Sequence, residues 1–139
     1  MAGRYWVVVT SRDHALNGAE LGIMQVNHGK EGPLKRMSEG DRVLIYAPKL
    51  IYKNKESYQR FVALAEIVDE VIFQVEVFPD FRPFRRKAKY LDINEVAIEP
   101  LIPKLDFIKN KKSWGYSFRF GFFEIGVQDF NLISSSMGK

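Results

Sequence analysis

Short stretches of β-branched and aromatic residues alternate with polar turns along the chain. In the first stretch, residues 4–10, alternation places Tyr5, Val7 and Val9 on one face of a strand and the even-numbered residues on the other. Residues 42–47 follow a glycine turn, precede a proline and predict a core strand. The remaining predicted strands are residues 21–26, 60–67, 71–78 and 84–91, with a bulge or tight turn between the second and third.

Short helices are predicted at the connections between strands. Ser11 is suited to the N-cap of a helix that ends near Asn17, and residues 126–136 carry apolar side chains at helical spacing. Residues 33–37 and 99–104 predict helical turns, and residues 134–139 predict a flexible tail. About six strands with short peripheral helices predict one α+β domain over residues 1–139, or a small barrel.

Composition restricts the classes of chemistry. The 139 residues include no cysteine, which excludes disulfides, thiolate metal sites and a thiol nucleophile. No apolar run approaches the roughly 20 residues of a membrane-spanning helix, and the N-terminal apolar run is too short for a signal peptide. We therefore expect a cytoplasmic protein that has no membrane partner.

Positive charge is concentrated in the second half of the chain. The net charge is +4, but residues 1–81 contain ten Lys and Arg against eleven Asp and Glu. Residues 82–119 contain ten against four. A localised cationic surface attracts phosphates, although a solvated basic face is the simpler alternative.

Two segments interleave aromatic and basic residues, namely 81–90 and 109–119. Such segments hold single-stranded nucleic acid, where stacking contributes about 1–3 kcal/mol per base. Trp114 lies in a polar, basic loop and is a candidate for a binding site. The alternative, that rings are core and charges are solvated, is expected for Phe84, Phe120, Phe122 and Phe123.

Catalytic and metal-binding patterns are not evident. His14 and His28 have no ligand partner at helical spacing, so we expect both at the surface, with no metal and no cofactor. Sequence patterns of serine hydrolases, dinucleotide folds and phosphate loops do not occur. Glu66 and Glu124 are open to acid–base roles, but nothing selects them, and we predict that the chain is not an enzyme.

Four blocks of the sequence resemble the EVE domain family: residues 5–11, 40–46, 105–115 and 123–133. The resemblance implies a PUA-like fold, a compact β-barrel of about six strands with short peripheral helices, related to YTH and ASCH domains. It also implies nucleic-acid binding, because EVE domains are regarded as readers of modified bases in DNA or RNA. Residues 21–24 lack the aromatic residue that many EVE members carry there, so a cage of three rings is not expected.

The resemblance implies a base pocket, and the basic segments add a phosphate surface. The pocket residues would be Trp6, Thr10, Ser11, Met24, Gln25, Asn27, Tyr46, Pro48, Trp114 and Phe118. The phosphate-binding residues would be Arg85, Arg86, Lys109, Lys111, Lys112 and Arg119.

The predicted function is a module that binds RNA or modified DNA through a pocket for a single base, plain or modified. Two alternatives stay open. One is an enzyme acting on nucleic acid or a nucleotide, by analogy with ASCH domains. The other is a protein-interaction domain, since Trp and Tyr are also enriched at protein interfaces. A homodimer is compatible with the sequence, which leaves the oligomeric state open.

Overall fold

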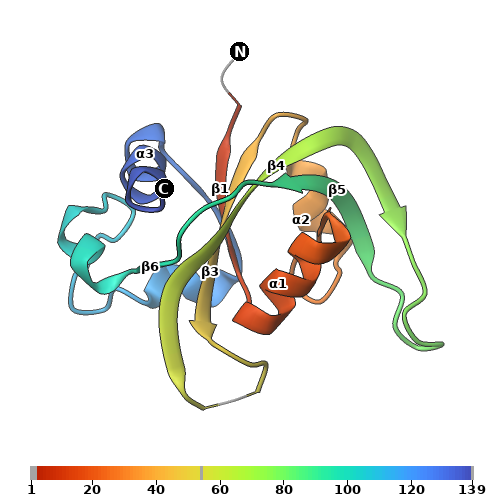
Figure 1. Cartoon of the computed structure of the whole chain (residues 1–139), viewed down its shortest axis with the longest axis horizontal. Coiled ribbons are helices and arrows are strands. Elements are labelled where there is room, and N and C mark those ends of the chain that lie inside the picture. Colours follow the sequence, from red (N-terminus) through yellow and green to blue (C-terminus); the bar gives the residue numbers. More distant parts are fainter. Residues whose placement is uncertain (1–2, 54, 139) are drawn as a thin grey trace.

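The structure is a computed structural model that describes residues 3–53 and 55–138 (Figure 1). Strands form most of the chain, and short helices connect them. In chain order the elements are β1 (Tyr5–Val9), α1 (Arg12–Leu21), β2 (Ile23–Met24), α2 (Glu31–Arg36), β3 (Arg42–Lys49), β4 (Ser57–Gln74), β5 (Phe84–Tyr90), β6 (Val96–Ala97), the 3-10 helices η1 (Glu99–Lys104) and η2 (Tyr116–Phe120), β7 (Phe122–Ile125) and α3 (Val127–Ser136).

The strands form one mixed sheet in the order β2-β5-β4-β3-β1-β7, and β6 pairs with β4 outside this path. β1 and β3 run parallel, whereas the other pairs are antiparallel. The predicted α+β class is confirmed. Within the described ranges β2 and β7 do not pair, so the sheet stays open where a closed barrel was expected.

β4 is one long strand where the sequence pattern predicted two. It continues through Asp69 and Glu70, and its pairing with β5 changes register between Ile67 and Ile72. The predicted bulge therefore lies inside a continuous strand. Figure 1 shows β4 curving across the whole molecule, which carries its second half and β5 away from the centre of the sheet.

Arg86 of β5 fills the space beside this bulge. Its side chain is 1% exposed, and Nη1 donates to the Leu34 carbonyl at 2.9 Å and to the Met37 carbonyl. Nη2 donates to the Asp69 carbonyl where the ladder is broken. The prediction that Arg86 binds phosphate is therefore wrong, because a buried guanidinium occupied by carbonyl oxygens cannot reach a ligand.

The sheet has a hydrophobic core on each face. Trp6 and Val8 pack beneath α1 and α2, whereas Val7 packs against α3, η1 and η2, as the alternation in β1 predicts. Trp6 donates from Nε1 to Asp41 Oδ2 at 2.8 Å and stacks on Phe122 with ring centroids 4.8 Å apart. Trp6 is fully buried, so it is a core residue and not part of a pocket surface.

The C-terminal segment is ordered. Residues 134–136 belong to α3, and the Met137 side chain is buried in the second core. The Met137 carbonyl also accepts the Asn94 backbone N–H at 2.9 Å. The structure thus places residues 134–136 in a helix where a flexible tail was predicted, and position 139 of that prediction lies outside the described residues.

Candidate functional site

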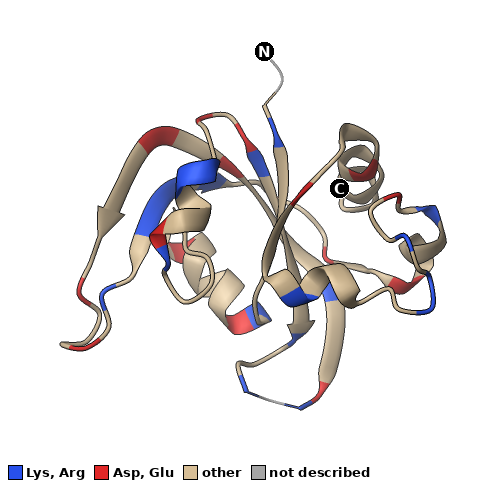
Figure 2. Ribbon diagram, turned by 180° about the vertical axis from the view of Figure 1, so that it is seen from behind, with Lys and Arg blue, Asp and Glu red and all other residues tan. Residues whose placement is uncertain are grey.

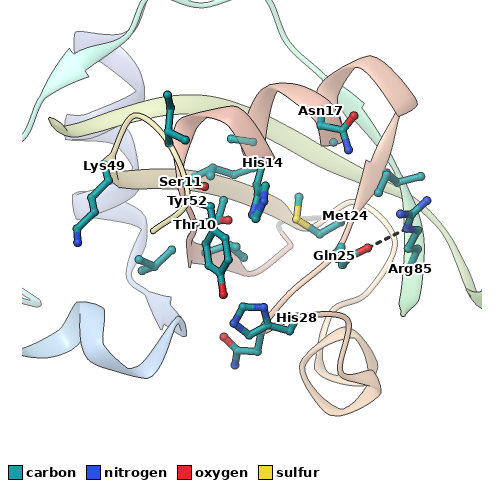
Figure 3. Close-up of a pocket in the computed structure, with 18 of the residues that line it drawn as sticks. Thr10, Ser11, His14, Asn17, Met24, Gln25, His28, Lys49, Tyr52 and Arg85 are labelled. Carbon is teal, nitrogen blue, oxygen red and sulfur yellow. Dashed lines mark hydrogen bonds between the residues drawn. The ribbon is translucent and has the colours of Figure 1, made fainter. Parts of the chain in front are cut away.

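A cavity of about 570 Å³ opens beside the N-terminal part of α1. Its walls come from the end of β1, from α1, from the segment around β2, from the end of β3 with the loop that follows, and from β5. The side chains that Figure 3 labels along it are Thr10, Ser11, His14, Asn17, Met24, Gln25, His28, Lys49, Tyr52 and Arg85.

Three aromatic rings meet in this cavity. The His14 ring stacks on Tyr52 with centroids 4.9 Å apart and planes inclined by 29°. The His28 ring meets Tyr52 edge-on at 5.9 Å and 69°. Tyr52 thus lies between the two histidines (Figure 3), which come from α1 and from the turn after β2. A cage of three rings was not expected, because residues 21–24 contain no aromatic residue. The structure nevertheless brings three rings together, and they come from other elements of the chain.

The Ser11 hydroxyl is the most unusual polar group of the cavity. Ser11 is 8% exposed, and its Oγ has no hydrogen-bond partner in the described chain. Its backbone precedes α1 in the extended N-cap conformation, but its side chain does not cap the helix. An unpaired buried hydroxyl is unfavourable by about 1–3 kcal/mol.

Asp13 holds the loop that carries Tyr52. Its Oδ1 accepts the Tyr52 backbone N–H at 3.2 Å, and its own N–H donates to the Leu50 carbonyl at 3.0 Å. Partial burial raises the pKa of Asp13. The nearby Ser11 hydroxyl and the backbone N–H groups of His14 and Tyr52 lower this pKa, and together they outweigh the effect of burial, so the net shift is downward. The Ser11 hydroxyl influences this carboxylate without reaching hydrogen-bond geometry.

A strained turn places Asn27 and His28 at the cavity. Their φ angles are 48° and 61°, in the left-handed region that non-glycine residues rarely occupy. Gly29 continues the turn at 86° and contacts Pro83 so closely that a Cβ there would lie 2.2 Å from the proline Cβ. Gly121 is packed as tightly on Asn27, since its Cβ would lie 2.2 Å from Oδ1. Such strain persists only when surrounding contacts fix the backbone, and it is frequent at binding sites.

The opposite wall is fixed by hydrogen bonds. Arg85 Nε donates to Gln25 Oε1 at 2.8 Å, which orients both side chains along the wall (Figure 3). The Tyr90 hydroxyl donates to the Ile23 carbonyl at 2.7 Å. Burial raises the pKa of Tyr90, so this donor stays protonated at neutral pH.

The cavity contains part of the predicted pocket. Other predicted residues lie on the far face of the sheet: Tyr46 is buried and stacks on Phe118 at 4.2 Å. Trp114 meets Phe118 edge-on at 6.1 Å and is partly buried against the second core. Four predicted residues therefore do not line the cavity, namely Trp6, Tyr46, Trp114 and Phe118. The predicted residues that line the cavity are Thr10, Ser11, Met24, Gln25, Asn27 and Pro48.

The predicted phosphate-binding residues are divided in the same way. Arg85 lines the cavity, whereas residues 109–112 and Arg119 lie in η2 and the loop before it. Lys111 Nζ donates to the Leu105 carbonyl at 2.7 Å. Lys49 and Lys53 line the cavity instead and were not predicted.

Sequence reasoning missed His14, His28 and Tyr52. An aromatic residue in a polar loop was the signal that selected Trp114, and the same signal holds for Tyr52 between Ile51 and Lys53. No comparable signal marks the two histidines, because their proximity depends on how α1 meets the turn after β2.

The two carboxylates considered for catalysis lie elsewhere. Glu66 pairs with Arg42 at 3.5 Å and Glu124 pairs with Arg4 at 3.4 Å, and neither lines the cavity. In residues 3–53 and 55–138, no three His, Asp or Glu side chains gather in a way suited to a metal ion.

In the same ranges no helix has the length and apolarity needed to cross a membrane.

Comparison with solved structures supports the fold. The YTH domain of the Zygosaccharomyces rouxii MRB1 protein, solved in complex with N6-methyladenosine RNA, aligns with a TM-score of 0.61 at 14% identity and covers 98% of this chain and 87% of that one. A hypothetical protein from Leishmania major aligns with a TM-score of 0.60 at 17% identity over 96% and 93%. The YTH likeness fits a PUA-like fold, as predicted.

Comparison with protein sequences identifies the family. A UPF0310 protein encoded in the gntR 5' region of Bacillus licheniformis is 48% identical over 130 residues, which is 94% of this chain and 88% of the relative. A UPF0310 protein of Mycolicibacterium vanbaalenii is 44% identical over 95% of this chain and 91% of that protein. The EVE domain model matches residues 4–136. The chain therefore belongs to the EVE domain family.

Proposed function

We propose that this chain is a nucleic-acid-binding module that receives a single base of RNA or DNA, plain or modified, in the cavity beside Tyr52. Family membership supports a binding module of this kind. The likeness to a YTH domain that was solved in complex with N6-methyladenosine RNA supports a base as the ligand.

One observation carries the proposal: Ser11, whose buried Oγ has no hydrogen-bond partner among the described residues, lines the same cavity as the ring group of His14, Tyr52 and His28. A nucleobase presents a flat π face and a polar edge. The rings offer stacking or edge contacts to the face, and the hydroxyl can donate to or accept from the edge. The volume of about 570 Å³ lies within the range of small-ligand sites, roughly 300–1,000 Å³.

The other polar groups suit the same ligand. Asn27 and Gln25 line the cavity, and their amides can pair with donor and acceptor atoms of a base edge. Lys49 and Lys53 line it at the end of β3 and in the loop beyond, and supply positive charge for the attached phosphates. A base with its phosphate would therefore find both kinds of partner here.

We propose binding without catalysis. Ser11 and His14 line one cavity, yet among residues 3–53 and 55–138 Ser11 Oγ has no hydrogen-bond partner, so no described side chain is placed to activate this hydroxyl as a nucleophile. The polar side chains act in the proposal as hydrogen-bond partners only.

The test is calorimetric titration with heptanucleotides of RNA and DNA that carry adenine or N6-methyladenine at the centre, and with matching heptamers centred on the other bases. Tyr52→Ala is expected to weaken binding by about 5- to 150-fold, the equivalent of about 1–3 kcal/mol of stacking. Val127→Ala serves as the control, because Val127 is exposed on α3, on the opposite face of the sheet. Absence of binding to every heptamer at low salt would overturn the proposal, because phosphate contacts are strongest there.

A further inference from the structure

Two exposed rings project from η2, Tyr116 and Phe120. They are 60% and 58% exposed, and they contact each other edge-on with centroids 5.6 Å apart. The Arg119 guanidinium lies 5.8 Å from the centroid of the Tyr116 ring. Phe118, between them in sequence, points the other way and is 8% exposed. Phe120 was expected in the core, and its exposure corrects that expectation.

The helix that carries these two rings ends beside the proposed base cavity. Gly121 directly follows Phe120, and its carbonyl accepts the Val9 backbone N–H at 2.9 Å. Its α-carbon packs on the Asn27 side chain without room for a Cβ. Val9 and Asn27 both line the cavity, so the C-terminal end of η2 lies against the cavity wall.

The charge of this segment favours a polyanion. Residues 107–121 contain four Lys and Arg and no Asp or Glu; Figure 2 colours the basic residues blue and the acidic residues red. Of these cations, Arg119 lies beside the exposed rings, and Lys109 and Lys112 are exposed in the preceding loop. Rings beside cations with no carboxylate in the segment match the flat bases and phosphates of a nucleic-acid strand.

We propose that Tyr116 and Phe120 form a stacking platform for a nucleotide that flanks the base in the cavity, with Arg119 at its phosphate. The inference rests on the proposed function and deepens it, since it identifies the ligand as an unpaired strand. Bases in a duplex are already stacked on their neighbours, so a platform of exposed rings adds affinity only when the flanking bases are free.

The test compares a platform variant, Tyr116→Ala/Phe120→Ala, with the wild-type protein on the same heptanucleotides, single-stranded and annealed to a complement, by fluorescence anisotropy. The platform variant is expected to bind single-stranded heptamers about 5- to 150-fold more weakly, whichever base is at the centre. The ratio of affinities for modified and plain heptamers should stay at its wild-type value, because the cavity is intact. Tyr52→Ala should change that ratio.

A matched control is Val68→Ala/Val127→Ala, which also removes two exposed apolar side chains, from β4 and α3. Arg119→Gln is a second, independent variant that keeps both rings, and it should lower the slope of log affinity against log salt by about 0.7, the value for one phosphate contact on a single strand. Unchanged affinity for single-stranded heptamers in the platform variant would overturn the platform and leave the cavity proposal standing. Failure of the wild-type protein to bind any heptamer would overturn the cavity proposal as well.

Discussion

The Asp13 carboxylate accepts the backbone N–H of Tyr52 at 3.2 Å and thereby ties the loop after β3 to the first turn of α1. The ring that contacts both cavity histidines is thus placed by a residue that does not line the cavity. Asp13 is a positioning residue in this arrangement.

Asp13→Ala is expected to weaken nucleotide binding by roughly two- to fivefold, because a net hydrogen bond contributes about 1 kcal/mol and this one is largely exposed. The carboxylate has a lowered pKa in the folded state. The ionised Asp13 carboxylate therefore stabilises the folded state above the ordinary pKa of Asp, and this stabilisation is lost as the pH falls through the lowered pKa. Calorimetric titration with the heptanucleotides at neutral pH measures the loss of affinity, with Glu20→Ala on α1 as the control. Equal affinities in both variants would show that the loop holds its position without Asp13.

Gly121 is the second positioning element. Its φ of 72° and the 2.2 Å approach to Asn27 Oδ1 leave no room for a side chain. Gly121→Ala should lower the free energy of unfolding by about 1–3 kcal/mol and displace Asn27 from the cavity. Urea denaturation measures the loss.

Gly32→Ala is the matched control for this substitution. Gly32 lies in α2 with open space around its α-carbon, so alanine there should leave the free energy of unfolding unchanged or raise it by up to about 1 kcal/mol. Equal effects at both glycines would contradict the packing argument.

Local sequence predicted β1, β3 and β5 well, but it divided β4 in two, missed β6 and β7, and misplaced the end of α1. The pair Asn17–Gly18 was interpreted as the end of a helix, yet α1 continues to Leu21 and ends at Gly22, which has a φ of 69°. Gly18 serves a different purpose: a Cβ there would lie 3.2 Å from the Tyr90 hydroxyl. A glycine required by a distant packing partner is indistinguishable, in one sequence, from a glycine that stops a helix.

The candidate site was predictable only where it follows strand ends. Thr10 directly follows β1 and Pro48 lies near the end of the adjacent β3, and both positions were predicted from the resemblance to the EVE domain family. Tyr46 was misplaced although β3 alternates regularly: Ile45 and Ala47 face the core beneath α1, and Tyr46 faces the opposite core. The meeting of His14, His28 and Tyr52 depends on tertiary packing and on the left-handed turn at Asn27, which local pattern does not encode.

Substitutions at the neighbouring residues Arg86 and Arg85 should have different effects, the first on stability and the second on binding. Arg86→Met leaves the carbonyls of Leu34, Met37 and Asp69 without their donor, so the free energy of unfolding should fall by about 2–5 kcal/mol. Arg85→Met should change it by less than about 1 kcal/mol, because that side chain is partly exposed at the cavity. Urea denaturation of both variants measures this difference. Nucleotide affinity should fall in Arg85→Met. A stable Arg86→Met protein would contradict the structural role.

Ser11 gives the sharpest separation between folding and binding, because the two effects have opposite signs. Its Oγ is buried, has no hydrogen-bond partner among the described residues and does not cap α1, so Ser11→Ala removes an unfavourable group from the free protein at the cost of its effect on the Asp13 carboxylate. The free energy of unfolding should stay equal or rise by up to about 1 kcal/mol. The bound base would lose its partner, and affinity should fall by about fivefold or more for the roughly 1 kcal/mol of a lost hydrogen bond. Urea denaturation and titration of the same preparation measure both quantities. A destabilised variant with wild-type affinity would assign the hydroxyl to the start of α1 and remove it from the proposed site.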